Sequence, residues 1–408
     1  MLLSFLTTVA FGFGCAALPD NRKSYDTPKI LKPFPCQQLP PFNSRLLNRS
    51  WSVLPTFWQG SPEELQTPEQ IAFAAGFQMV VVTLHVHNTE DQVISACRAV
   101  KQFKPQCSCI MYWNVQLVMN HTKAGVALQS TKQDWLLRDN LGRIMLPANR
   151  FLTVDYRIPA AGAWFLSGCA NATRSGVVDG CNLDGGNEFW YAYSAFLRKD
   201  PNFPVNSQKD YVLAFRSALQ FLQRTIPDKA LFLHCEQCVI PPSRRLESPC
   251  IDGWCKDKGN GSAVGLNGQA IQDFYPSLEY VDIVRYVSGC GKWFKVFVGG
   301  GAPTVLNCSI PADRGLLLSA WLVAAGDGSY FMCGDEGAVT STFPEFHKAL
   351  GKPNGPAHAV VVGGKQVLVR DFSSGTRAIF MPHPSNRTAL GAGCVKWADQ
   401  TISGQCPC

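Results

Sequence analysis

Short apolar runs alternate with amphipathic stretches through the middle of the chain, and eight of these runs have the length of a β-strand. A run that is apolar throughout is typical of a strand buried on both faces of a sheet. Alternation of such strands with helices predicts a parallel sheet with crossover helices. The eight predicted strands are residues 51–58, 78–85, 109–115, 177–184, 230–236, 268–274, 293–298 and 329–333.

Apolar residues at helical spacing lie between these strands. Pro276 directly follows the sixth predicted strand and can occupy the first turn of a helix. Leu278, Val281 and Val284 then repeat along one helical face, and residues 312–325 supply the next helix. Eight alternations match a (β/α)8 TIM barrel better than an open sheet. No nucleotide-binding glycine pattern follows the first strand, which weighs against a dinucleotide-binding fold. The predicted fold class is therefore an α/β barrel.

The C-terminal part of the chain has a different pattern. Residues 360–362, 366–372 and 376–381 are short predicted strands, separated by Gly363-Gly364 and Ser374-Gly375. Such pairs favour tight hairpins. We therefore expect a small antiparallel β unit next to the barrel.

The patterns divide the chain into four predicted parts. A leader (1–17) and an N-terminal extension (18–47) precede the catalytic barrel (48–345), and a C-terminal β unit with a Cys-rich tail (346–408) follows it. The barrel carries a Cys-containing insertion (238–265) after its fifth strand.

The leader and the cysteines indicate export. Residues 1–17 are apolar and end in small residues, as in a cleaved signal peptide. The run is too short for a membrane anchor, and no later segment is long and apolar enough to span a bilayer. Of seventeen cysteines, sixteen remain once Cys15 is removed, an even number that fits disulfide pairing in an oxidising compartment. Six sequons for N-glycosylation agree with a secreted, extracellular protein: Asn48, Asn120, Asn171, Asn260, Asn307 and Asn386.

Charge and short motifs exclude several classes of function. The net charge of +7 is modest and the Lys and Arg residues are scattered, so no nucleic-acid partner is predicted. The sequence contains no G-x-S-x-G elbow, Walker loop or H-E-x-x-H helix. These absences argue against the commonest serine hydrolases, NTPases and zinc proteases.

Carboxylates at the ends of the middle strands are the candidate catalytic groups. Active sites of (β/α)8 barrels form at the carboxyl ends of the strands. Asp184 ends the fourth strand between glycines and can stabilise an oxocarbenium-like sugar; the alternative is a cap on the following loop or helix. A second carboxyl must protonate the leaving oxygen. Glu236 at the end of the fifth predicted strand and Asp273 at the end of the sixth are equal candidates for this acid. The alternative for Glu236 is a loop carboxylate beside a structural disulfide, and for Asp273 it is a partner of a helix N-terminus.

Several polar and aromatic residues are candidates for substrate binding. Asn114 ends the third strand and can bind a sugar hydroxyl or cap the following loop. Sugar rings stack on aromatic faces, although aromatic residues are more often buried. The aromatic candidates are Trp58, Trp113 and Trp190.

Histidines and a cysteine pair raise the question of a metal. His85 and His87 at the second strand, with His234 on the fifth, offer imidazole ligands but lack the remaining ligands of a metallohydrolase centre. We interpret His85 and His87 as polar lining of a sugar site, and predict neither a metal nor a cofactor. Cys235-x-x-Cys238 fits structural disulfides in an exported chain better than a redox or zinc pair.

Longer motifs resemble a known group of enzymes. The segments Y-W-N (112–114), W-L-L-R-D-N-L-G-R (135–143), V-D-Y-R-I-P (154–159) and V-D-G-C-N-L-D-G (178–185), with L-G-K-P-N-G-P-A (350–357) and V-R-D-F-S-S-G (369–375), are similar to those of glycoside-hydrolase-like (β/α)8-barrel families. These are related in plan to the α-amylase and α-galactosidase superfamily. The resemblance implies that Asp184 is the nucleophile and that Glu236 or Asp273 is the acid. Two residues depart from the pattern of these families. Many members have a bulky apolar residue in place of Asn182, and several have Glu in place of Asp273.

Three functions follow, and the first is favoured. The chain is predicted to be a secreted glycoside hydrolase that cleaves a polysaccharide or glycoconjugate with paired carboxylates. The alternatives are a catalytically inactive carbohydrate-binding barrel and a metal-dependent barrel hydrolase. The sequence favours no particular sugar, linkage or oligomeric state.

Overall fold

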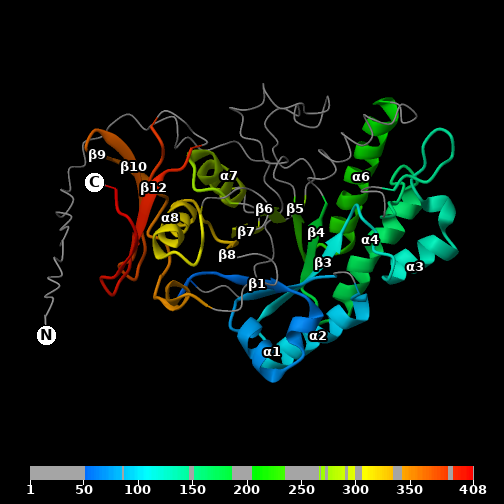
Figure 1. The fold of residues 1–408 in the computed structure, drawn as a ribbon, viewed down its shortest axis with the longest axis horizontal. Helices are drawn as coiled ribbons and strands as arrows, with labels where there is room; N and C mark the ends of the chain where they lie inside the picture. The colour runs from blue at the N-terminus through cyan, green and yellow to red at the C-terminus, as the bar shows by residue number, and fades with distance from the viewer. Residues whose placement is uncertain are drawn as a thin grey trace, which may run out of the picture.

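Two β-sheets and the helices around them organise the chain (Figure 1). The structure, a computed structural model, describes residues 51–84, 87–146, 151–185, 205–234, 266, 268–271, 274–289, 293–298, 306–333, 342–384 and 389–407. The predicted leader, the N-terminal extension and the insertion at 238–265 lie outside these residues.

The larger sheet has eight strands, all parallel and in sequence order. Just before the first strand, Thr56 is bridged to Phe331 of the last, and the Phe331 N–H donates to the Pro55 carbonyl at 2.9 Å, so the two edge strands lie side by side. The strands are β1 (Phe57–Gly60), β2 (Met79–Val82), β3 (Ser108–Asn114), β4 (Gly180–Asp184), β5 (Ala230–His234), β6 (Gly268–Ile271), β7 (Trp293–Val298) and β8 (Ser329–Cys333).

All eight predicted strands are present, and two match residue for residue. The seventh and eighth coincide with β7 and β8. The first was predicted at 51–58 but β1 begins only at Phe57. Pro55 has no N–H for a ladder, which explains why regular pairing starts after it.

The described helices lie between successive strands of the larger sheet, except between β5 and β6. They are α1 (Pro68–Ala75), α2 (Glu90–Phe103), α3 (Lys123–Ser130), α4 (Pro159–Arg174), α6 (Val205–Thr225), α7 (Leu278–Gly289) and α8 (Pro311–Leu322), with short 3-10 turns η3 (Pro62–Leu65), η4 (Gln133–Trp135) and η8 (Pro344–His347). Threonines at positions 67, 89 and 122 cap the first three helices by accepting an N–H bond from the third helical residue. The helix predicted after Pro276 is α7, and Leu278, Val281 and Val284 are buried along it. No described helix combines the length and apolarity needed to cross a bilayer.

Disulfides show which side of the middle strands faces the helices. Cys109 of β3 is bonded to Cys97 of α2, and Cys181 of β4 is bonded to Cys169 of α4. Because side chains alternate along a strand, residues at odd spacing from these cysteines point to the other side of the sheet. Two further disulfides join Cys308 to Cys333 and Cys394 to Cys406. Cys107 is a buried free thiol, so the sixteen cysteines do not all pair with one another.

The smaller sheet confirms the predicted antiparallel unit and extends it. Its strands lie in the order β13-β12-β11-β10-β9. Three were predicted: β9 (His358–Val362), β10 (Lys365–Asp371) and β11 (Arg377–Met381). Two were not: β12 (Ala392–Lys396) and β13 (Ile402–Gly404) are short and contain glycine, so they lack the alternating apolar pattern.

Helix α8 joins the two sheets (Figure 1). On one side Trp321 packs on Phe331 of β8, with ring centroids 5.5 Å apart. On the other, Gly315 approaches Gly404 of β13 so closely that a Cβ on Gly315 would lie 2.0 Å from the Gly404 nitrogen. Residues of both sheets belong to one hydrophobic core.

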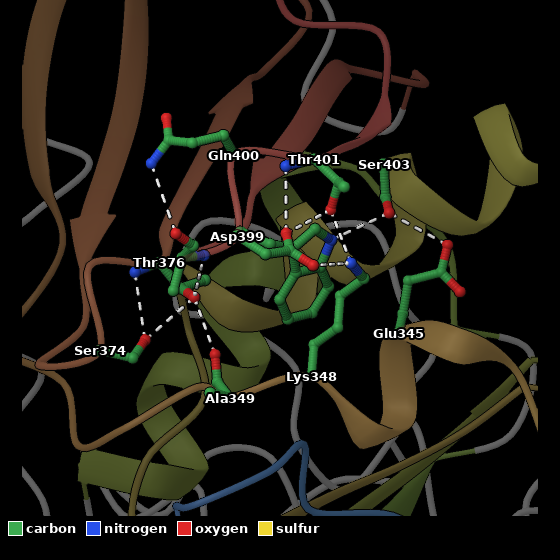
Figure 2. Close-up of polar contacts among 11 residues, drawn as sticks. Glu345, Lys348, Ala349, Ser374, Thr376, Asp399, Gln400, Thr401 and Ser403 are labelled. Carbon is green, nitrogen blue, oxygen red and sulfur yellow. Dashed lines mark hydrogen bonds and ion pairs between the residues drawn. The ribbon is translucent and has the colours of Figure 1, made fainter.

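The segment that enters the smaller sheet is held by polar contacts (Figure 2). Lys348 Nζ contacts Asp399 Oδ2 at 2.5 Å and Thr401 Oγ1 at 2.6 Å. Ser403 Oγ donates to Glu345 Oε1 at 3.0 Å, while Thr376 Oγ1 donates to the Ala349 carbonyl at 3.0 Å. These contacts fix η8 and the residues after it against β13, the turn between β12 and β13, and the residue before β11.

Candidate active site

The ends of β3, β4 and β5 bring four polar side chains to one place. Asn114 is the register partner of Asp184 on the neighbouring strand. Leu183 is the partner of Leu233, so the next pair along the strands is Asp184 and His234. Side chains at matching positions of parallel strands point to the same side of the sheet. The three residues therefore meet at the carboxyl end of the sheet, on the side away from the disulfide-bonded helices.

Asp184 is the centre of this cluster. Its Oδ1 lies 2.6 Å from His234 Nδ1, and its Oδ2 accepts a hydrogen bond from the Tyr112 hydroxyl. Asn114 Nδ2 lies 3.4 Å from the same Oδ2 and 3.3 Å from the Tyr112 oxygen. Both carboxylate oxygens are thus engaged by side chains from the two flanking strands.

Asn114 also holds the turn that follows β3. Its Oδ1 accepts from the backbone N–H groups of Gln116 at 2.9 Å and Leu117 at 2.6 Å. The amide oxygen therefore caps the loop, which is the alternative role predicted for Asn114, while the amide nitrogen faces the Asp184 carboxylate. Gly185, with φ +89, passes close by, and a Cβ there would lie 2.9 Å from Asn114 Oδ1.

The surroundings hold Asp184 in its charged form. Burial raises the pKa of this carboxyl, but the hydrogen bond and charge of His234, followed by hydrogen bonds from Tyr112 and from the Gly185 N–H, outweigh it and lower the pKa to about 2. The side chain keeps 22% of its surface exposed, and that of His234 keeps 12%. Asp184 is accordingly an ionised carboxylate with a partly open face.

Two tryptophans predicted to stack on sugars lie elsewhere. Trp113 points to the helix side of β3, is 3% exposed, and packs on Phe165 of α4 with ring centroids 5.3 Å apart. Trp58 is also buried, and a Cβ at Gly60 would lie 2.4 Å from its ring. The structure brings neither ring to Asp184.

The remaining predicted site residues are placed as follows. His87 is exposed in the loop after β2, with its ring centroid 6.4 Å from that of His121. Within the described part of the chain, no group of three or more His, Cys, Asp or Glu side chains is arranged to hold a metal. The other four candidates lie outside the described residues: His85, Trp190, Glu236 and Asp273.

The sequence analysis did not predict that Tyr112 and His234 contact Asp184. His234 was considered only as a metal ligand, and Tyr112 only as part of a motif. Strand alternation could have identified Tyr112, because it lies two residues before Asn114 and therefore on the same face of β3. His234 could have been considered because, like Asp184, it is the last residue of its strand.

Comparison with known proteins gives structural likeness only. No protein-family model and no curated protein sequence matches this chain. The glycoside hydrolase domain of PelA from Pseudomonas aeruginosa is 14% identical, with 72% of this chain and 95% of that one covered and a TM-score of 0.40. An alpha-galactosidase from Lactobacillus brevis is also 14% identical, with coverages of 82% and 47% and a TM-score of 0.47. A cyclic alpha-maltosyl-(1→6)-maltose hydrolase from Arthrobacter globiformis is 10% identical, with coverages of 85% and 89% and a TM-score of 0.46. All three are glycoside hydrolases, the class that the sequence motifs resemble, but likeness at this level leaves the activity to be inferred from the site.

Proposed function

We propose that this chain is a glycoside hydrolase whose central charged group is Asp184. The observation that carries the proposal is the clamped, ionised carboxylate at the carboxyl end of β4. Catalytic groups of parallel barrels lie at this end of the strands. We take the eight-stranded sheet as a (β/α)8 barrel, a view supported by the bridge between Thr56 and Phe331.

Asp184 suits one of the two carboxylate roles in glycoside hydrolysis. Its pKa of about 2 keeps it charged at neutral pH, so it can stabilise or attack the positive anomeric carbon but cannot donate a proton. The acid must be another group. Glu236, two residues beyond β5, and Asp273, two residues beyond β6, both remain candidates. A separation of about 5–5.5 Å from Asp184 would give retention of configuration, and roughly 6.5–9.5 Å would give inversion.

The substrate we propose is an extracellular polysaccharide or glycoconjugate. Four disulfides among the described residues fit an oxidising compartment. Three sequon asparagines, Asn120, Asn171 and Asn307, are exposed and thus accessible to a glycosylating enzyme. These features support a secreted enzyme that acts outside the cell, with residues 346–408 as a structural appendage of the barrel.

Hydrolysis of a broad glycan and aryl-glycoside panel by the full secreted chain tests the proposal, with Asp184→Asn beside it. Asparagine keeps the shape of the side chain but removes the charge, and we expect kcat/KM to fall by at least about a hundredfold. Asp91→Asn is the matched control, because Asp91 is exposed on α2 and its ion pair among the described residues is with the exposed Lys123. Full activity of Asp184→Asn would remove Asp184 from its role. Glycan binding without hydrolysis by the wild type would instead favour the inactive carbohydrate-binding barrel.

A further inference from the structure

We propose that His234 is a positioning residue for Asp184, whose imidazole N–H fixes the carboxylate plane and keeps the group charged during turnover. The proposal rests on the function proposed for Asp184. It assigns His234 no contact with substrate and no proton transfer.

The geometry of the pair is that of a charge-assisted hydrogen bond. His234 Nδ1 and Asp184 Oδ1 are 2.6 Å apart, slightly shorter than the roughly 2.7–2.9 Å usual for an ionised nitrogen donor and a carboxylate. The two side chains come from adjacent strands at the same level of the sheet. Rigid strands on both sides leave the contact little freedom to shift.

His234 contacts a different carboxylate oxygen of Asp184 from the one that Tyr112 and Asn114 contact. Tyr112 and Asn114 both belong to β3 and both contact Oδ2. Among the described side chains, His234 is the one that contacts Oδ1. A carboxylate held at one oxygen can still rotate about its Cβ–Cγ bond, whereas contacts at both oxygens from opposite strands fix its plane. An oriented carboxylate is what attack on, or stabilisation of, an anomeric carbon requires.

The electrostatics agree with the geometry. The described titratable groups that face Asp184 are Tyr112 from β3 and His234 from β5. Burial raises the pKa of Asp184, and the contributions of His234 are the largest of those that lower it. Without the imidazole, burial would be opposed mainly by Tyr112 and the backbone. The carboxyl would then take up a proton at higher pH.

Two neutral amides at position 234 separate positioning from general structural support. In His234→Asn the amide nitrogen falls near the place of Nδ1 and can still donate to Oδ1. In His234→Gln it falls near the place of Nε2, so the donor is displaced. We expect His234→Gln to raise the acid limb of the kcat/KM profile by about one to two pH units, and His234→Asn to stay much closer to the wild type. KM should change less than kcat, because the ground-state substrate need not touch residue 234.

A readout without turnover keeps the test independent of the substrate. The Asp184 carboxyl is titrated by ¹³C NMR on the full chain labelled at aspartate, with Asp184→Asn to identify the signal. We expect its titration midpoint to rise in His234→Gln, by the same one to two units or about ten- to a hundredfold in proton affinity. An unchanged midpoint in folded His234→Gln would overturn the proposal, as would equal behaviour of the two amides. A shifted midpoint in a protein that hydrolyses no glycoside would leave the positioning contact standing and refute the proposed function instead.

Discussion

The buried ion pair between Arg314 and Glu345 gives the sharpest prediction for stability. Arg314 Nε lies 3.0 Å from Glu345 Oε2 and its Nη2 lies 3.1 Å from Oε1. Each side chain is only 7% exposed. Ser403 donates to Glu345 Oε1, and Arg314 Nη1 donates to the Cys308 carbonyl at 2.6 Å. The pair therefore links α8, η8 and β13 at the junction of the two sheets.

Replacing Glu345 by Gln removes the charge and keeps the shape. The Arg314 guanidinium would remain buried beside a neutral amide, and removal of one partner of a buried pair costs about 3–5 kcal/mol. Because Gln still offers one acceptor oxygen, we expect the lower end, a loss of about 3 kcal/mol in the free energy of unfolding. Replacing both partners, as Arg314→Met with Glu345→Leu, leaves no unpaired charge and should recover most of this loss.

The effect also has a predicted pH dependence. Burial raises the pKa of Glu345, but the hydrogen bond from Arg314 leads the contacts that outweigh it, so the pKa lies below its ordinary value of 4.5. A carboxyl with a lowered pKa stabilises the folded state fully above the pKa of the unfolded chain. The contribution is lost as pH falls through the lower, folded-state value. The difference between wild type and Glu345→Gln should therefore be largest near neutral pH and shrink in acid.

Denaturant unfolding of the full chain, followed by fluorescence at pH 7 and at pH 4, measures both effects. Glu63→Gln is the control, because Glu63 is exposed in η3 and should change stability by less than about 0.5 kcal/mol. A loss below about 1 kcal/mol in Glu345→Gln, or a double variant no more stable than the single one, would refute the reasoning.

Two further predictions follow from single contacts. Tyr112→Phe removes the hydroxyl that donates to Asp184 Oδ2, so the pKa of Asp184 should rise and the acid limb of kcat/KM should move to higher pH; an unmoved limb would contradict the assigned contact. Gly315→Ala places a Cβ 2.0 Å from the Gly404 nitrogen, and we expect overpacking to cost about 1–3 kcal/mol in thermal or denaturant unfolding. Gly355→Ala, where a Cβ would meet nothing within 4 Å, is its control, and equal stability of the two variants would count against close packing of α8 on β13.

The strands predicted most accurately from the sequence are those with a clear local pattern of apolar residues. β7 and β8 are short, mainly apolar runs that contain one polar residue each, Lys295 and Ser329, and the predicted limits of both strands match the observed ones. β12 and β13 form because neighbouring strands and α8 offer partners, which no local pattern encodes. Propensity is a weak guide to such strands, since their stability comes from packing across the sheet.

The position of a residue at the end of a predicted strand was enough to identify part of the site, but the prediction did not consider to which side of the sheet each side chain points. Asp184 and Asn114 were found because each ends a strand. Trp113 was placed at the same site, although it directly precedes Asn114 and must therefore face the opposite side of β3. The same alternation would have included Tyr112. Whether His234 would contact Asp184 depended on register between strands, which a single sequence does not reveal.

Cys107 has a consequence for handling the protein. In the native state this thiol is buried and donates toward the Phe77 carbonyl, and burial raises its pKa to about 11, so little of the reactive thiolate exists at neutral pH. Unfolding would return it to an ordinary thiol pKa, two residues from Cys109 and the disulfide to Cys97. Each excursion to the unfolded state then releases a nucleophile that can reshuffle that bond. Because thiol–disulfide exchange takes seconds to hours and speeds up with the thiolate fraction, the shelf life of the purified protein should follow the equilibrium population of unfolded protein and fall as storage pH rises.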